Sequence, residues 1–173
     1  VLDPDDVEHR RTLRDVCKIT HHHEEAYVGA LAVATALRAA CASPFDASLE
    51  RVAATLPDSR VRDRVRELAA VDAGADLEAV AARFGNSGYV VESVPLALFV
   101  ARDAATLGFE GVLERALRAG GDVDTIASIA GQIAGAVLTR PAIDRVLLDR
   151  VDEIAHVTAM ASAVAECVER LRA

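Results

Sequence analysis

The chain has 173 residues, enough for one domain with a buried core. Hydrophobic residues make up 52% of it but aromatic residues only 3%, so a dense core requires helices that approach one another over small side chains. The net charge of −8, with one Lys among 19 basic residues, argues against nucleic acid or an anionic membrane as the main partner.

Helical periodicity dominates the chain, and no convincing strand pattern is present. In chain order, the pattern predicts helices over about 5–18, 21–41, 46–56, 58–71, 76–82, 90–105, 109–119, 122–138 and 142–171. Asp3-Pro4-Asp5-Asp6 gives the first helix a capping start, and Thr20 is expected to cap the second. We therefore predict a single all-α domain over residues 1–173.

Cysteine usage and hydropathy indicate the compartment. Cys17, Cys41 and Cys167 are odd in number and widely spaced, which favours buried thiols in a reducing compartment over disulfides or a zinc site. No signal peptide is visible, and the longest uncharged apolar run, 26–37, is too short to span a bilayer. We expect a soluble, cytoplasmic protein without a membrane partner. The first residue is Val1 rather than Met, which is compatible with a processed, cleaved or excised chain.

The most informative stretch is Gly120-Gly121-Asp122-Val123-Asp124-Thr125, at the start of the predicted helix 122–138. Hard oxygen ligands at a helix start suit a divalent cation such as Mg²⁺ or Mn²⁺. Asp122 and Thr125 are three residues apart and can converge on one side, whereas Asp124 can reach a second ion. Three oxygens are too few for Mg²⁺, so other ligands must come from elsewhere. The alternative is a plain helix cap after a Gly-Gly turn.

Small residues recur along the helix that follows. Ala127, Gly131 and Gly135 are spaced by four, and glycine inside a helix is costly. We expect this helix to lie centrally and to contact its neighbours closely through these positions.

Two further segments are candidate binding elements. His21, at the predicted start of the helix 21–41, is expected to face a ligand as a neutral donor or acceptor, although solvated surface histidines are the alternative. In the loop 84–89, glycines such as Gly85 let a ligand approach the backbone, and the hydroxyls of Ser87 and Tyr89 can bond sugar or phosphate. The alternative is a plain connection between helices.

Three segments, in this order, resemble the C-terminal part of the ADP-ribosylglycohydrolase family over about 11–151. They are Thr20-His21 with Tyr27 and Gly29-Ala30, then Glu92-Ser93-Val94-Pro95 with Leu96-Ala97-Leu98, then Gly120 to Thr125 with Ile126-Ala127 and Gly131 to Gly135. The last is the most specific.

The resemblance implies an all-α orthogonal helical bundle with two divalent ions in a cleft. It implies hydrolysis of the N- or O-glycosidic bond between ADP-ribose and a protein side chain. Asp122, Asp124 and Thr125 would then bind Mg²⁺ or Mn²⁺. His21, with Ser93 and the 85–89 loop, would lie in the ADP-ribose pocket.

The family's N-terminal Gly-Asp-Ala-x-Gly and Asp-Asp-Thr motifs are not in this chain, and Asp5-Asp6-Val7 does not replace them. We therefore expect the chain to hold half of the metal site and no catalytic acid. The N-terminal half of the fold would come from a separate chain or segment, and this chain alone would be inactive. The alternatives are a non-catalytic structural or binding module derived from the same fold, and a plain helical bundle with a fortuitous motif.

Overall fold

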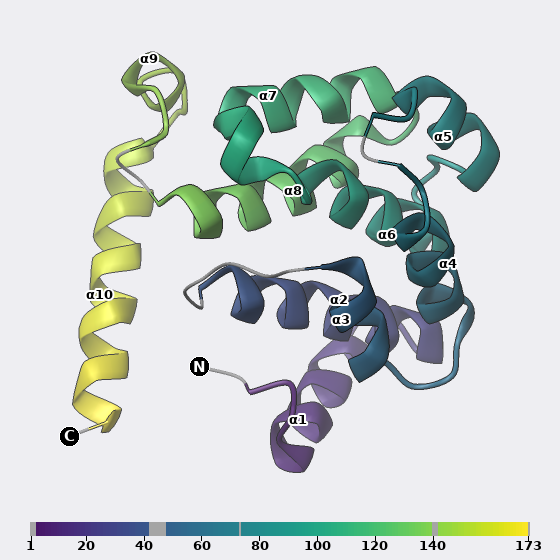
Figure 1. Ribbon diagram of the computed structural model, residues 1–173. Coiled ribbons are helices and arrows are strands. Elements are labelled where there is room, and N and C mark those ends of the chain that lie inside the picture. The colour runs from purple at the N-terminus through teal and green to yellow at the C-terminus, as the bar shows by residue number, and fades with distance from the viewer. Residues whose placement is uncertain (1–2, 42–47, 73, 140–141, 173) are drawn as a thin grey trace.

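The computed structural model describes residues 3–41, 48–72, 74–139 and 142–172, and the regular structure of these ranges is helical throughout (Figure 1). The helices run in the order α1 Val7–Lys18, α2 Glu24–Ala40, α3 Leu49–Thr55, α4 Arg60–Ala69, α5 Leu77–Phe84, α6 Val90–Ala101, α7 Ala104–Ala119, α8 Val123–Leu138, α9 Arg145–Leu148 and α10 Ile154–Arg172. The all-α prediction is confirmed.

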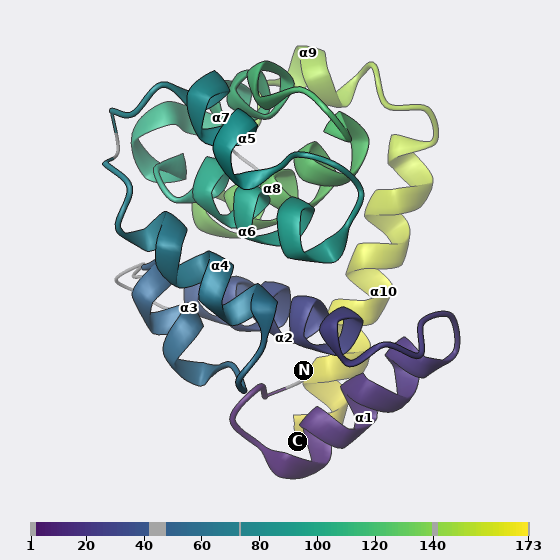
Figure 2. The ribbon, with the colours of Figure 1, turned by 90° about the vertical axis from the view of Figure 1, so that its right-hand side faces the viewer.

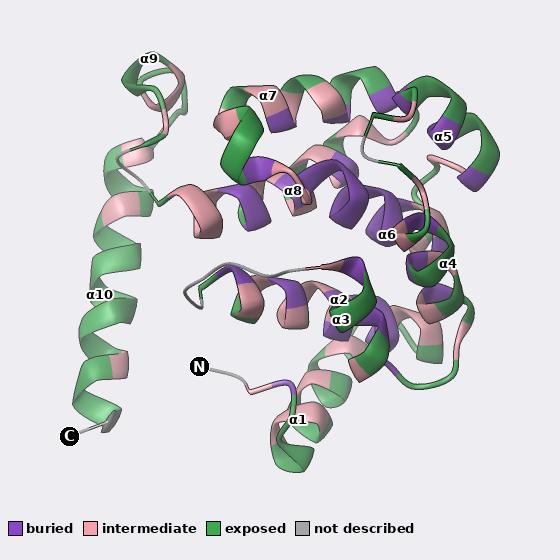
Figure 3. Cartoon of the chain, viewed as in Figure 1, coloured by how far each residue is buried: buried purple, intermediate pink, exposed green. Residues whose placement is uncertain are grey.

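Helix α6 forms the centre of the molecule. It is buried at every position from Ser93 to Ala101, and it packs against α2, α4, α7 and α8 (Figure 3). A helix that is apolar on all sides is stable only when neighbours cover it all round. The helix expected to be central, α8, packs against α2, α6 and α7, but it fully buries only one stripe, comprising Ile126, Ala130, Ile133 and Ala134.

Close helix contact occurs at a different glycine from those the sequence suggested. A Cβ at Gly131 would lie 3.7 Å from a Leu113 methyl, and one at Gly135 would lie 4.0 Å from Phe109, so both positions have room for a methyl group. A Cβ at Gly29 of α2 would instead overlap Val90 Cγ2 of α6. The small side chain is therefore needed where α2 crosses α6, and not on α8.

Helix starts follow local capping chemistry. Asp6 caps α1 as predicted, accepting hydrogen bonds from the backbone N–H groups of Glu8 and His9. The predicted cap Thr20 is wrong, because α2 begins three residues later than expected, with His23 as its N-cap. The His23 Nδ1 accepts the backbone N–H of Glu25 at 3.2 Å.

The C-terminal segment departs from the single helix that the sequence predicted over 142–171. Glu153 has a φ of 64°, which ends the regular path between α9 and α10. Helix α10 then runs along the edge of the molecule, beside the helical body rather than inside it (Figures 1 and 2). Its side chains Val157, Met160 and Val164 are each more than half exposed.

The cysteines are free thiols, but they are not buried as expected: Cys41 and Cys167 are exposed and Cys17 is half-buried. Within the helices that the structure describes, none has both the length and the apolar character that a bilayer crossing requires.

Candidate metal and ligand site

The loop 85–89 and the Gly120–Gly121 turn pack directly against each other. The loop connects α5 to α6, and the turn connects α7 to α8. The backbone oxygen of Asn86 accepts the Asp122 N–H at 2.8 Å. The side-chain Nδ2 of Asn86 donates to the carbonyl oxygen of Ala119, also at 2.8 Å. One residue of the loop therefore bonds both ends of the turn.

Two glycines make this contact sterically feasible. Gly121 has a φ of +69°, and a Cβ there would lie 2.5 Å from Asn86 Cγ and overlap the Asn86 carbonyl oxygen. A Cβ at Gly88 would lie 2.6 Å from Asp122 Oδ2. The Asp122 carboxylate thus lies against the bare backbone of the loop, and a side chain at Gly88 would displace it.

The three predicted metal ligands share the first turn of α8 but differ in exposure. Asp122 is half-buried and caps the helix, with its Oδ1 3.4 Å from the Thr125 N–H. Thr125 is half-buried, and Asp124 is exposed. Across the described part of the chain, no three His, Cys, Asp or Glu side chains are grouped so as to hold a metal ion. The hard-oxygen donor set fits Mg²⁺ or Mn²⁺, but these residues alone do not complete a coordination sphere.

Glu92 binds the inner side of the loop. Its Oε2 accepts the Ser87 hydroxyl at 2.6 Å and the Ser87 N–H at 3.1 Å. These two hydrogen bonds to the ionised form lower the pKa of the Glu92 carboxyl below its ordinary value. A Cβ at Gly85, which has a φ of +88°, would lie 2.6 Å from Glu92 Cγ. Gly85 and Ser87 therefore already have a partner within the chain.

Tyr89 joins the loop to the start of α2. Its hydroxyl donates to Glu25 Oε2 and accepts from Arg60 Nη1 at 2.9 Å, and the Arg60 guanidinium lies over its ring at 5.5 Å. Donation to Glu25 raises the pKa of the Tyr89 phenol, because ionisation would break that hydrogen bond. Tyr89 is 40% exposed, whereas the side chain of its hydrogen-bond acceptor, Glu25, is only 12% exposed.

The two remaining predicted residues have local partners. His21 lies before α2 and is exposed, and its Nδ1 is 2.8 Å from the Thr20 hydroxyl. Ser93 is only 2% exposed, and its hydroxyl donates to the Tyr89 carbonyl oxygen at 3.2 Å. Ser93 thus supports the first turn of α6 from the interior.

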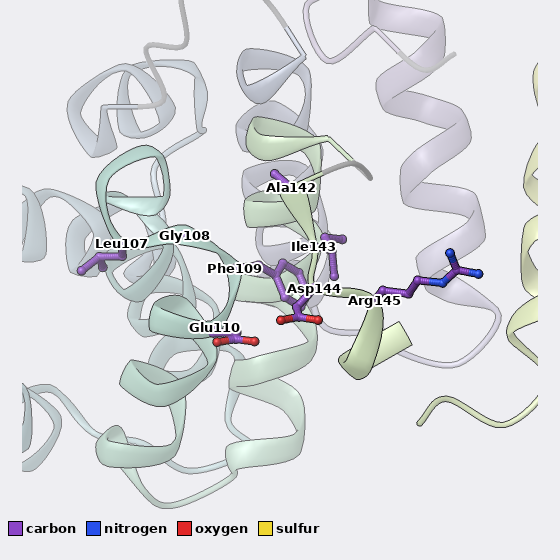
Figure 4. Close-up of a pocket in the computed structure, with 8 residues that line it drawn as sticks. All are labelled: Leu107, Gly108, Phe109, Glu110, Ala142, Ile143, Asp144 and Arg145. Carbon is purple, nitrogen blue, oxygen red and sulfur yellow. The ribbon is translucent and has the colours of Figure 1, made fainter. Parts of the chain in front are cut away.

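A hollow of about 520 Å³ lies elsewhere, between the start of α7 and the segment before α9 (Figure 4). Glu110 and Asp144 supply carboxylates to it, and Arg145 extends away from them. It contains none of the predicted site residues. The hollow is broad and open, whereas hydrogen bonds fix the contact between the loop and the turn.

Sequence reasoning did not single out Asn86, Gly88, Glu25 or Glu92 as individual site residues. Asn86 and Gly88 were within the recognised loop, and Glu92 was within the recognised block after it. No signal in the sequence pointed to Glu25, because its partner Tyr89 is distant along the chain.

The family model described as ADP-ribosylglycohydrolase matches residues 2–172 of this chain. No curated protein matches it. The match covers almost the whole chain, and it places the protein in the general class of hydrolases of that type.

Proposed function

Because the chain belongs to the ADP-ribosylglycohydrolase family, we propose that it takes part in hydrolysing the glycosidic bond between ADP-ribose and a protein side chain. In this proposal the chain supplies Asp122, Asp124 and Thr125 to a site for two Mg²⁺ or Mn²⁺ ions. The remaining ligands and the catalytic acidic residue come from the N-terminal half of the fold, on a separate chain or segment. The substrate partner is ADP-ribose attached to protein.

The observation that supports this proposal best is the contact between Asp122 and the loop. The helix cap to Thr125 and the bare backbone at Gly88 both restrict the Asp122 carboxylate. A carboxylate held in one place loses little conformational freedom on binding an ion. Asp124 lies on another side of the same helix turn. It is exposed and so remains open to a second ion.

The chain's own groups would then bind and orient the ligand. His21, Ser87 and Tyr89 are exposed and would contact a ribose or phosphate. Ser87 and Tyr89 would do so while bonded to Glu92 and Glu25. Divalent ions held by Asp122, Asp124 and Thr125 would supply Lewis acidity, orienting the ribose diols and a water molecule.

A second candidate function is a non-catalytic structural or binding module of the same fold. It is favoured by the contacts that Gly85 and Ser87 make with Glu92, which give these loop residues partners within the chain. The two candidates differ in whether ion and nucleotide binding are coupled.

Titration calorimetry distinguishes them. We expect Mn²⁺ and ADP-ribose to bind in a coupled manner once the N-terminal portion of an ADP-ribosylglycohydrolase is added, and hardly at all to this chain alone. Asp124→Ala should abolish the coupled binding. Glu50→Ala is the matched control, since it removes an exposed first-turn carboxylate from α3. If the reconstituted protein binds neither ion nor nucleotide, the enzymatic proposal is wrong.

We also propose a cytoplasmic location. Exposed free thiols at Cys41 and Cys167 persist most readily in a reducing compartment. An expressed, tagged protein that fractionates with an oxidising compartment would contradict this.

A further inference from the structure

The loop 85–89 is held from two sides, and each side uses a different chemistry. On one side, a single carboxylate oxygen of Glu92 accepts both the hydroxyl and the N–H of Ser87. The Ser87 hydroxyl oxygen in turn accepts the Tyr89 N–H at 3.2 Å. Glu92 therefore fixes the middle of the loop and the residue that precedes α6.

On its other side, the same loop meets the start of α8. The Asn86 carbonyl oxygen accepts the Asp122 N–H, and the Gly88 backbone lies against Asp122 Oδ2. The residue that Glu92 bonds, Ser87, lies between these two contacts in the chain. A shift of the loop at Ser87 therefore moves either the Asn86 oxygen that accepts the Asp122 N–H or the Gly88 backbone beside the Asp122 carboxylate.

We propose that Glu92 is a positioning residue for Asp122, acting through the 86–88 backbone. Glu92 does not itself contact Asp122 or a ligand. It holds Ser87, and the flanking residues Asn86 and Gly88 hold the start of α8. That Asp122 then serves as a metal ligand rests on the proposed function, whereas the mechanical link does not.

The geometry also accounts for Gly85. With a φ of +88° and a would-be Cβ 2.5 Å from Glu92 Oε2, Gly85 provides the space in which the carboxylate folds back over the loop. This glycine therefore accommodates a protein carboxylate, where the sequence suggested that it accommodates a ligand.

The first test needs no metal and uses the chain as it is. Amide hydrogen exchange, followed residue by residue by NMR, should show faster exchange at both Ser87 and Asp122 in Glu92→Ala. Glu92→Gln keeps an acceptor oxygen and should lie between Glu92→Ala and the wild type. Glu78→Ala, which removes a first-turn carboxylate from α5, should change neither amide. Faster exchange at Ser87 with unchanged exchange at Asp122 would overturn the proposal.

The second test uses the chain combined with the N-terminal half of the fold. Outer partners of metal ligands typically alter metal affinity by about 10-fold or more, and we expect such a loss of Mn²⁺ affinity in Glu92→Ala, with partial rescue in Glu92→Gln. Unchanged Mn²⁺ affinity in a protein whose wild type binds Mn²⁺ would also overturn the positioning role. If the wild type binds no Mn²⁺, the proposed function fails, and the exchange data alone decide the link between Glu92 and Asp122.

Discussion

Replacing Gly121 with alanine should destabilise the chain more than the same change at its neighbour Gly120. Both residues have positive φ, 69° and 65°. The positive φ of Gly121 costs a residue with a Cβ roughly 1–2 kcal/mol. Gly120 has a ψ of −163°, a backbone region that costs a residue with a Cβ about 1–3 kcal/mol. At Gly121 the new methyl also overlaps the Asn86 carbonyl oxygen, and relieving such overpacking costs about 1–3 kcal/mol more. At Gly120 the methyl would lie 3.7 Å from Asn86 Nδ2, an ordinary contact.

Urea unfolding measures the difference directly. The change in unfolded-chain entropy on converting glycine to alanine is the same at both positions, so it cancels when the two variants are compared. We expect the free energy of unfolding of Gly121→Ala to fall below that of Gly120→Ala by about 1–3 kcal/mol. Gly108→Ala is a second control, since Gly108 has a φ of 73° and a Cβ added there would have no other atom within 4 Å. Equal losses in Gly121→Ala and Gly120→Ala would refute the described contact between turn and loop.

Three further predictions concern stability. Gly131→Ala should raise the free energy of unfolding by about 1 kcal/mol in urea, because the methyl fits and helix propensity improves; Gly29→Ala, which meets Val90, should lower it in the same assay. Thr139 caps α8 at φ 64° and ψ 162°, a backbone region that costs any residue except glycine about 1–3 kcal/mol. Thr139→Gly should therefore raise the melting temperature, and an unchanged or lower melting temperature would contradict backbone strain at Thr139. The lowered pKa of Glu92 means that its contribution is present above its ordinary pKa of 4.5 and is lost as pH falls through the folded-state value. The stability gap between wild type and Glu92→Gln, measured by urea unfolding, should therefore be constant well above the ordinary pKa and should narrow as the pH falls below it.

Most helices were predictable because apolar periodicity and capping residues act locally. The helix predicted over 109–119 agrees with the regular part of α7, which begins after the break at Gly108. The start of α2 was wrong because a histidine supplied the cap in place of the threonine that propensity favours. The continuous helix over 142–171 was wrong because its apolar pattern carries across Glu153, whose positive φ is not visible in the sequence.

Helix burial was harder to predict than helix position. The glycine and alanine stripe on α8 suggested a central helix, and α8 does pack against α2, α6 and α7, but α6 is the more completely buried of the two. The apolar run of α6 contains no charged side chain apart from Glu92, and this was the better signal of burial on all sides. Small residues permit close packing, but they do not show which neighbour requires it. Gly29 requires it and Gly131 does not.

The candidate site shows the same ambiguity at each of its glycines. From the sequence, a glycine-rich loop and a Gly-Gly turn are two separate places where a ligand can approach the backbone. In the fold, each tight glycine instead faces a group of the protein: Gly85 faces Glu92, Gly88 faces Asp122 and Gly121 faces Asn86. The glycines therefore allow the loop and the turn to pack closely together in the absence of a ligand.

This arrangement narrows where a ligand meets the chain. At Gly88 and Gly121 the position of a side chain is taken by Asp122 and Asn86, although both glycines are exposed. Four of the predicted site residues are exposed: His21, Ser87, Tyr89 and Asp124. A paired Asp124→Ala and Tyr89→Phe comparison separates ion binding at Asp124 from hydroxyl recognition at Tyr89. If both variants of the reconstituted protein still bind ADP-ribose as tightly as the wild type, the ligand lies on a different face.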